Sequence, residues 1–187
     1  LRAARTRSLK SLPANVPGKV LLSGVGTGLD LPLLPKLHHY TALDFNAAML
    51  SRARQRGAKS HDESLQVDWL LGDWWEPLVE RRFHLVLSNP PYVAADDPHL
   101  AALRHEPLLA LTPGGDGLQA LRRIVHDAGR HLVDGAWLLL EHGHDQAEAV
   151  RCMLLHAGFT TVQTRADLAG QPRCTGGCWH AGGNPGL

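Results

Sequence analysis

The chain has 187 residues, 44% of them hydrophobic, which suits one globular domain with a buried core. Its 19 basic and 18 acidic side chains nearly cancel, which argues against the strongly positive surface of a nucleic-acid-binding protein. No apolar run approaches the roughly 20 residues needed to span a membrane. The three cysteines are too few for a disulfide framework. We therefore expect a cytoplasmic protein that neither inserts into a membrane nor binds nucleic acid stably.

Short apolar strands alternate with amphipathic helices along the chain. Strands are predicted at 19–23, 39–45, 65–73, 83–88, 136–142, 159–167 and 174–180. Helices are predicted at 46–56, 116–132 and 145–158. Asn46 is the expected cap of the first helix, and Pro32 and Pro35 require any helix before it to be short. This alternation predicts an α/β doubly wound sheet in one domain at 19–187, preceded by a basic leader or linker at 1–18.

A glycine-rich turn follows the first strand. It consists of Gly24, Val25, Gly26, Thr27 and Gly28. Glycines let the backbone turn sharply and let a ligand approach closely. The G-x-G-x-G spacing is similar to the cofactor loop of class I methyltransferases, which lies under S-adenosylmethionine, and differs from the G-x-G-x-x-G dinucleotide fingerprint.

Asp44 ends the second predicted strand, 20 positions after Gly24. A carboxylate there can accept protons from both ribose hydroxyls of a bound nucleoside. In a purely structural alternative, the glycines only make a tight turn and Asp44 only caps a helix. The spacing and the position at the strand end favour cofactor binding.

The third strand ends in "GDWWEPL", which places Asp73 and Trp74 at the same edge of the sheet. The carboxylate could accept the amino proton of adenine, and the indole could pack on the adenine ring. Alternatively, Trp74 and Trp75 only cover the end of the sheet. Taken alone, this motif does not distinguish the two interpretations.

The fourth strand ends in a proline corner with two fixed acceptors. The corner is formed by Asn89, Pro90, Pro91 and Tyr92. Asn89 offers its side-chain carbonyl and Pro90 its backbone carbonyl, and neither proline has an N–H. A planar –NH2 group, as in an amide or a nucleobase, matches such a pair, and Tyr92 could lie against it. We expect Asn89 and Pro90 to hold the nitrogen during methyl transfer, and a stiff structural turn is the alternative.

The cysteines raise the question of a metal. Cys174 and Cys178 lie four positions apart with His180 nearby, a spacing that resembles a zinc site. No second ligand pair accompanies them at suitable spacing. We therefore expect no metal.

Several longer segments resemble one family. They are "GDWWEPL", "FHLVLSNPPYVAADDPHL", "LRHEPLLALTPGGDGLQALRRIV", "GAWLLLEHGHDQAEAVRCMLLHAGF" and "TRADLAGQPRCTGGCW". From about residue 66 to 182 the chain resembles the release-factor glutamine methyltransferases, often called HemK. The N-P-P-Y corner also occurs in adenine methyltransferases of DNA, and the R-x-E-P-x-x-A-L-x-x-G-x-D-G-L segment narrows the choice. Its matching residues are Arg104, Glu106, Pro107, Ala110, Leu111, Gly114, Asp116, Gly117 and Leu118.

The resemblance implies a class I methyltransferase sheet, mostly parallel with an antiparallel last strand. It implies S-adenosyl-L-methionine as the methyl donor, held by residues 24–28, Asp44 and Trp74, with Asn89 at the reacting end. The implied substrate is the side-chain amide of the glutamine in the Gly-Gly-Gln loop of a peptide-chain release factor. Residues 89–92 would bind that glutamine.

The chain departs from this family at three points. The acidic residue usual two positions before the first loop glycine is replaced by Leu22. Residues 19–56 look closer to small-molecule methyltransferases, which suggests a junction near 57–65. The family's helical N-terminal domain, which helps engage the release factor, is not contained in the 18 residues before the first strand.

Two alternatives remain beside glutamine methylation. Adenine-N6 methylation of DNA or RNA would require base extrusion and a basic groove or recognition domain, and neither is evident. A non-catalytic mosaic or truncated domain that binds cofactor or release factor without turnover is the other, supported by Leu22 and by the missing helical domain.

Overall fold

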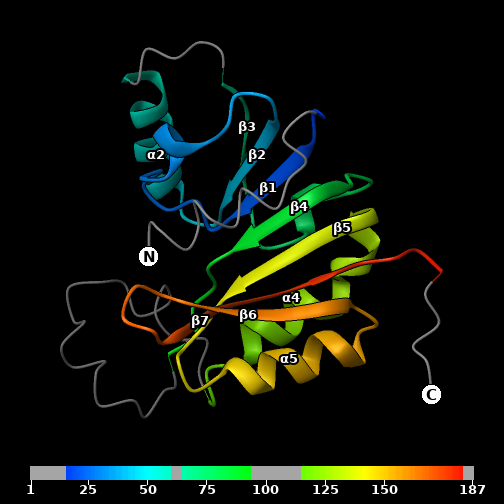
Figure 1. The fold of residues 1–187 in the computed structure, drawn as a ribbon. Coiled ribbons are helices and arrows are strands. Elements are labelled where there is room, and N and C mark those ends of the chain that lie inside the picture. The colour runs from blue at the N-terminus through cyan, green and yellow to red at the C-terminus, as the bar shows by residue number, and fades with distance from the viewer. Residues whose placement is uncertain (1–15, 60–64, 94–114, 183–187) are drawn as a thin grey trace.

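One seven-stranded sheet organises the protein (Figure 1). The computed structural model describes residues 16–59, 65–93 and 115–182. The strands are β1 Lys19–Ser23, β2 His39–Asp44, β3 Gln66–Leu71, β4 Phe83–Ser88, β5 Leu132–Glu141, β6 Thr160–Ala166 and β7 Pro172–Cys178. Their order is β3-β2-β1-β4-β5-β7-β6, and β7 runs antiparallel to both of its neighbours. The predicted α/β doubly wound sheet, mostly parallel with an antiparallel last strand, is confirmed.

Helices cover the two faces of the sheet unequally (Figure 1). The helices are α2 Ala47–Lys59, α4 Gln119–Ala128 and α5 Ala147–His156, with short 3-10 turns η1 Leu31–Leu33, η2 Glu76–Leu78 and η4 Gly129–His131. Apolar residues of α4 and α5 pack with Leu21, Val86 and Leu138 in the larger core cluster. On the opposite face, η1 packs over β1 and β4, and α2 covers the β2–β3 side.

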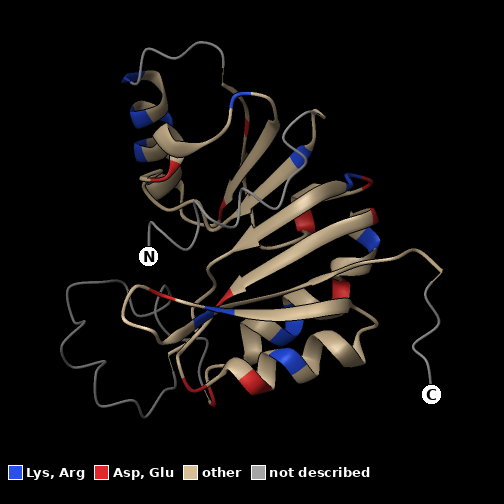
Figure 2. Cartoon of the chain, viewed as in Figure 1, with Lys and Arg blue, Asp and Glu red and all other residues tan. Residues whose placement is uncertain are grey.

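The segment after the first strand contains only the single turn η1, as Pro32 and Pro35 predict. Asn46 caps α2 as expected, because its Oδ1 accepts the backbone N–H groups of Ala48 and Met49 at 3.0 and 3.2 Å. Figure 2 shows basic residues along α2, which has no acidic side chain. Arg56 and Lys59 lie in its last turn, where cations interact favourably with the helix dipole.

The predicted boundary between the 116–132 helix and the next strand is wrong. Helix α4 ends at Ala128, and β5 already begins at Leu132. Leu132 pairs with Phe83, and the register then shifts so that Leu85 pairs with Trp137. Gly135, with φ +74°, lies in this irregular stretch. Pairing with β4 thus places Leu132 in the strand, although helical spacing alone assigns it to the preceding helix.

Smaller differences concern other element ends. Helix α2 extends to Lys59, three residues past its predicted end, while β3 ends at Leu71 and β7 at Cys178. Three parts of the predictions lie outside the described residues: residues 1–15 of the predicted leader at 1–18, residues 60–64 of the proposed junction, and residues 104–114 of the R-x-E-P segment. None of the described helices has the length and apolarity required to cross a membrane.

Candidate functional site

The carboxyl ends of β1, β2, β3 and β4 surround a pocket of about 390 Å³, which we call the outer pocket. Small-ligand sites commonly occupy roughly 300–1,000 Å³ and lie at this edge of an open α/β sheet. The predicted site residues that line it are Gly24, Val25, Gly26, Thr27, Asp44, Asp73, Trp74, Asn89 and Pro91. Sequence reasoning missed the apolar rim that Leu29, Phe45 and Met49 add to it.

The glycine turn is tied to the end of β2 by backbone hydrogen bonds. The N–H groups of Gly24 and Val25 donate to the Leu43 carbonyl at 2.9 and 3.0 Å. Gly26 has φ +58°, and a Cβ added there would meet no atom within 4 Å. The backbone of Gly26 therefore faces open space, as a loop that admits a ligand must.

Gly28, which was predicted to bind the cofactor, does not line the outer pocket. A Cβ at this position would lie 2.7 Å from Cδ1 of Leu31 and 3.0 Å from Cα of Ala53. Gly28 instead allows the loop to pack closely against η1 and α2. Its φ of +71° adds a second reason for glycine.

Asp44 is buried at the end of β2 with both carboxylate oxygens engaged. Its Oδ2 accepts the N–H of Gly26 at 2.8 Å, and its Oδ1 accepts the N–H of Asn46 at 2.9 Å. A carboxylate has about four lone-pair positions, so two remain for hydroxyl protons of a ligand. The structural alternative and the ligand-binding interpretation of Asp44 are thus compatible.

The two aromatic residues after β3 have different environments. Trp74 lines the outer pocket. Its backbone φ is +45°, a value that residues other than glycine rarely adopt. Trp75 stacks on His131, with ring centroids 4.7 Å apart. Both tryptophans pack against the larger core cluster, and of the two only Trp74 also lines the outer pocket.

Asp73 also lines the outer pocket, but its carboxylate is shared. Oδ2 of Asp73 accepts a hydrogen bond from Nη1 of Arg123 on α4 at 2.9 Å. Arg123 also reaches Glu76 at 3.3 Å. Any contact between Asp73 and a ligand must therefore coexist with this ion pair.

The proline corner begins where β4 ends at Ser88. Asn89 and Pro91 line the outer pocket, whereas Pro90 is buried and is not among its lining residues. Tyr92, predicted to lie against the substrate, is partly buried and packs against the larger core cluster. Within the described residues, Oδ1 of Asn89 is buried and accepts no hydrogen bond. Such an acceptor costs free energy unless a ligand or water satisfies it.

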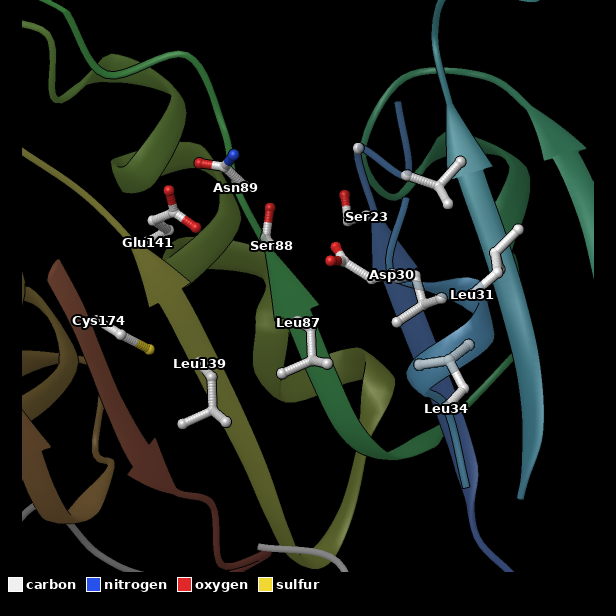
Figure 3. A pocket seen from close by; sticks show the side chains of 13 residues that line it. Ser23, Asp30, Leu31, Leu34, Leu87, Ser88, Asn89, Leu139, Glu141 and Cys174 are labelled. Atoms are coloured by element: carbon white, nitrogen blue, oxygen red, sulfur yellow. The ribbon is translucent and has the colours of Figure 1, made fainter. Parts of the chain in front are cut away.

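A second, smaller cavity of about 50 Å³ lies next to the outer pocket and shares Ser23, Gly24, Val25 and Asn89 with it. We call it the inner chamber (Figure 3). Its apolar wall includes Leu22, Leu87 and Leu139, which pair side by side across β1, β4 and β5. The position at which the resembled family has an acidic residue thus contributes an apolar surface here.

Two carboxylates that sequence reasoning did not single out lie in the inner chamber. Figure 3 shows Glu141 extending from the end of β5 beside Asn89, and Asp30 on the opposite side near Ser23. Glu141 lies near the end of the predicted strand "AWLLLEH", at the same edge of the sheet as Asn89. That position is the sequence feature from which its place in the site could have been predicted. Ser88 also lines the chamber, and its buried Oγ has no hydrogen-bond partner among the described residues.

Among the described residues, the charged side chains that line the two cavities are all acidic, and one of them, Asp73, is paired with Arg123. Four carboxylates line them, and the described lining contains no lysine or arginine. The site is therefore rich in acceptors and suits a cationic ligand that carries hydroxyl and amino donors. No group of three His, Cys, Asp or Glu among the described residues is arranged to hold a metal. Cys178 lies 3.5 Å from Nε2 of His180 and pairs in β7 as an ordinary strand residue.

Comparison with known proteins gives a consistent result. Residues 20–115 match a family model described as a methyltransferase domain. A release factor glutamine methyltransferase of Coxiella burnetii is 39% identical over 168 residues, which are 88% of this chain and 60% of that protein. One from Bordetella pertussis is 41% identical over 176 residues, which are 91% of this chain and 64% of that protein. The chain thus spans less than two thirds of either relative.

A solved structure supports the fold. The E. cuniculi Mtq2–Trm112 complex, described as responsible for methylation of the eRF1 translation termination factor, superposes with a TM-score of 0.65 at 20% identity. The match covers 95% of this chain and 94% of that chain. At this identity the likeness concerns the arrangement of the sheet and helices.

Proposed function

This chain belongs to the methyltransferase-domain family, and we propose that it transfers a methyl group from S-adenosyl-L-methionine to the glutamine side-chain amide in the Gly-Gly-Gln loop of a peptide-chain release factor. Relatives with that name at 39% and 41% identity support the substrate. The N-P-P-Y corner and its surrounding segments resemble the release-factor glutamine methyltransferases, and these relatives confirm that resemblance.

The outer pocket supports the choice of donor. The lone pairs that remain on Asp44 would accept the ribose hydroxyl protons, and Trp74 would pack against the adenine. The carboxylates around the two cavities complement the positive charge of the donor. When bound, S-adenosyl-L-methionine supplies a methyl group activated by its attachment to a sulfonium.

The proline corner supports the choice of acceptor atom. Oδ1 of Asn89 and the carbonyl of Pro90 would each accept one N–H of the glutamine –NH2 group. Two such bonds hold the nitrogen in place and favour the positive charge that develops on it during transfer. A new N–C bond forms as the C–S bond breaks, and the nitrogen then releases one proton to solvent.

The observation that carries this proposal is the buried Oδ1 atom of Asn89, which lies between the two cavities without a hydrogen-bond partner among the described residues. An amide acceptor in that condition calls for a donor from a ligand. A ligand –NH2 group supplies one.

The test offers the protein radiolabelled donor together with a release factor, the same factor with its loop glutamine changed to Ala, or DNA. We expect label only on the unmodified release factor. Label on DNA would favour adenine methylation, and binding of donor without any label would favour a non-catalytic domain. Asn89→Ala should abolish transfer while the donor Kd changes by less than about tenfold, because the residue contacts the acceptor group. Normal turnover in that variant would contradict the role given to Asn89.

A further inference from the structure

Gln146, just before α5, is hydrogen-bonded at both ends of its side-chain amide. Its Nε2 donates to the backbone carbonyl of Tyr92 at 2.9 Å, and its Oε1 accepts the backbone N–H of Gly143 at 2.9 Å. A carbonyl can only accept and an N–H can only donate, so these two partners determine the orientation of the amide. The residue is buried, with 9% of its surface exposed.

Gly143, which donates to Gln146, is linked to strand β7 by further hydrogen bonds. Nδ1 of His142 lies 2.7 Å from the Gly143 carbonyl and therefore carries the proton. Nε2 of His142 then accepts from Oγ1 of Thr175 in β7 at 2.7 Å. Thr175 in turn accepts from Thr164 in β6 at 2.8 Å, because its own proton is used on the histidine. A chain of hydrogen bonds thus runs from the antiparallel edge of the sheet to Gln146 and on to Tyr92.

Two of the four residues in the corner that receives this contact have no backbone donor. Pro90 and Pro91 have no N–H with which to bond neighbouring strands, and β4 pairing is recorded only as far as Ser88. The carbonyl of Tyr92 follows both prolines directly. Because their φ angles are restricted, a bond that holds Tyr92 also limits the positions available to the Asn89 and Pro90 carbonyls.

We propose that Gln146 is a positioning residue for methyl transfer, which holds the Asn89–Tyr92 corner through the Tyr92 carbonyl so that the acceptors at Asn89 and Pro90 face the reacting nitrogen. This inference rests on the proposed function and concerns a residue that lines neither the outer pocket nor the inner chamber. It differs from a packing role, because it depends on one donated hydrogen bond rather than on the volume of the side chain.

Two substitutions separate the donated bond from the accepted one. Gln146→Glu keeps the shape and the acceptor for Gly143 but has no proton for Tyr92 when ionised. Gln146→Met keeps the approximate length and removes both bonds. Gln163→Glu is the matched control, because Gln163 is exposed on β6 and the chemical change is the same.

The first measurement is amide hydrogen exchange, which needs neither substrate nor activity. In residues 89–93, only Asn89, Tyr92 and Val93 have an exchangeable backbone N–H. We expect exchange in this segment to be at least about tenfold faster in both Gln146 variants than in the wild type, with the α4 segment unchanged. Unchanged exchange at 89–93 in Gln146→Glu would overturn the proposal. If Gln146→Met does not fold, Gln146→Glu decides alone.

The second measurement is the kinetics of methyl transfer. We expect kcat to fall by roughly 10- to 100-fold in Gln146→Glu, because misplacement of about 1 Å can cost that much. The KM for the release factor and the Kd for S-adenosylhomocysteine should stay within about threefold. A normal kcat, or an equal loss of donor affinity, would overturn the positioning role.

The experiments distinguish failure of the proposed function from failure of the positioning role of Gln146. If the wild type methylates no release factor, the proposed function fails, and the exchange experiment still decides whether Gln146 holds the corner. If the wild type is active and Gln146→Glu is equally active, only the present inference fails.

Discussion

The backbone N–H of Gly26 donates to Oδ2 of Asp44 over 2.8 Å, so the last residue of β2 holds the middle of the loop that follows β1. The other oxygen, Oδ1, accepts the N–H of Asn46 at the start of α2. One buried carboxylate therefore connects two strand ends and one helix start at the edge of the outer pocket. This contact shapes the loop before any ligand arrives.

Substitution of Asp44 should weaken donor binding. In Asp44→Asn, the contact proposed to the ribose hydroxyls would lose its negative charge and one of its two acceptor atoms, and one of the backbone N–H groups of Gly26 and Asn46 would also lose its acceptor. Loss of a charge-assisted hydrogen bond costs about 1.5–3 kcal/mol, so we expect S-adenosylhomocysteine affinity to fall at least about tenfold by titration calorimetry. Asp134→Asn, an exposed change in β5, is the control. Equal affinities for the Asp44 variant and the wild type would contradict the ligand role of Asp44.

Two glycines of the same loop should respond differently to alanine. Gly28→Ala would place a Cβ 2.7 Å from Leu31, so we expect the larger fall in Tm from this variant. Gly26→Ala meets no neighbouring atom and bears mainly the cost of its positive φ, about 1–2 kcal/mol. Its added methyl faces the outer pocket, so donor affinity should fall more in Gly26→Ala. Thermal melts should show the lower Tm in Gly28→Ala, and titration calorimetry should show the weaker donor binding in Gly26→Ala.

Asp73 and Arg123 can be separated by paired substitutions. Their ion pair is about half exposed, so its loss in Arg123→Ala should change the free energy of unfolding by less than about 1 kcal/mol. If Asp73 accepts the adenine amino proton, Asp73→Ala should lower S-adenosylhomocysteine affinity about tenfold, while Arg123→Ala should leave it within about threefold. Equal losses in both variants would instead mean that the ion pair itself shapes the pocket.

His142 should make the protein sensitive to mild acid. Burial lowers the pKa of His142 below its ordinary 6.5, and the hydrogen bond to the Gly143 carbonyl offsets this only in part. Below about pH 6.5 the unfolded chain binds the proton more readily, so the free energy of unfolding should fall as the pH falls. One such group contributes at most about 1.4 kcal/mol per pH unit. Urea denaturation at pH 7.5, 6.5 and 5.5 measures this slope.

His142→Asn supplies the comparison, because its amide keeps a donor and an acceptor but does not titrate in this range. Burial and the nearby His84 also lower the pKa of His38, so the wild type loses stability through both histidines. The difference between wild type and variant isolates His142. Identical slopes between pH 6.5 and 5.5 would contradict the prediction.

Much of the fold could be predicted, because apolar strands and polar turns follow local rules. The strands at 19–23 and 83–88 have the predicted bounds, and the Asn46 cap and the short turn forced by Pro32 occur as expected. The start of β5 could not be predicted, because Leu132 joins the strand only through its pairing with Phe83. That pairing involves a residue about 50 positions away in the sequence.

The candidate site divides in the same way. The residue types at the strand ends follow from the order of amino acids alone, since an Asp at the end of β2 and an Asn-Pro-Pro-Tyr corner after β4 have a limited set of uses at a parallel sheet edge. Which of these residues face a cavity depends on the folded arrangement. Gly28 packs closely against Leu31 and Ala53, Tyr92 packs against the larger core cluster, and Glu141 lies beside Asn89. The hydrogen bond from Gln146 to Tyr92 joins residues 54 positions apart. Side-chain direction at such a site depends on strand register and on what packs behind each turn, and neither is encoded within a few neighbouring residues.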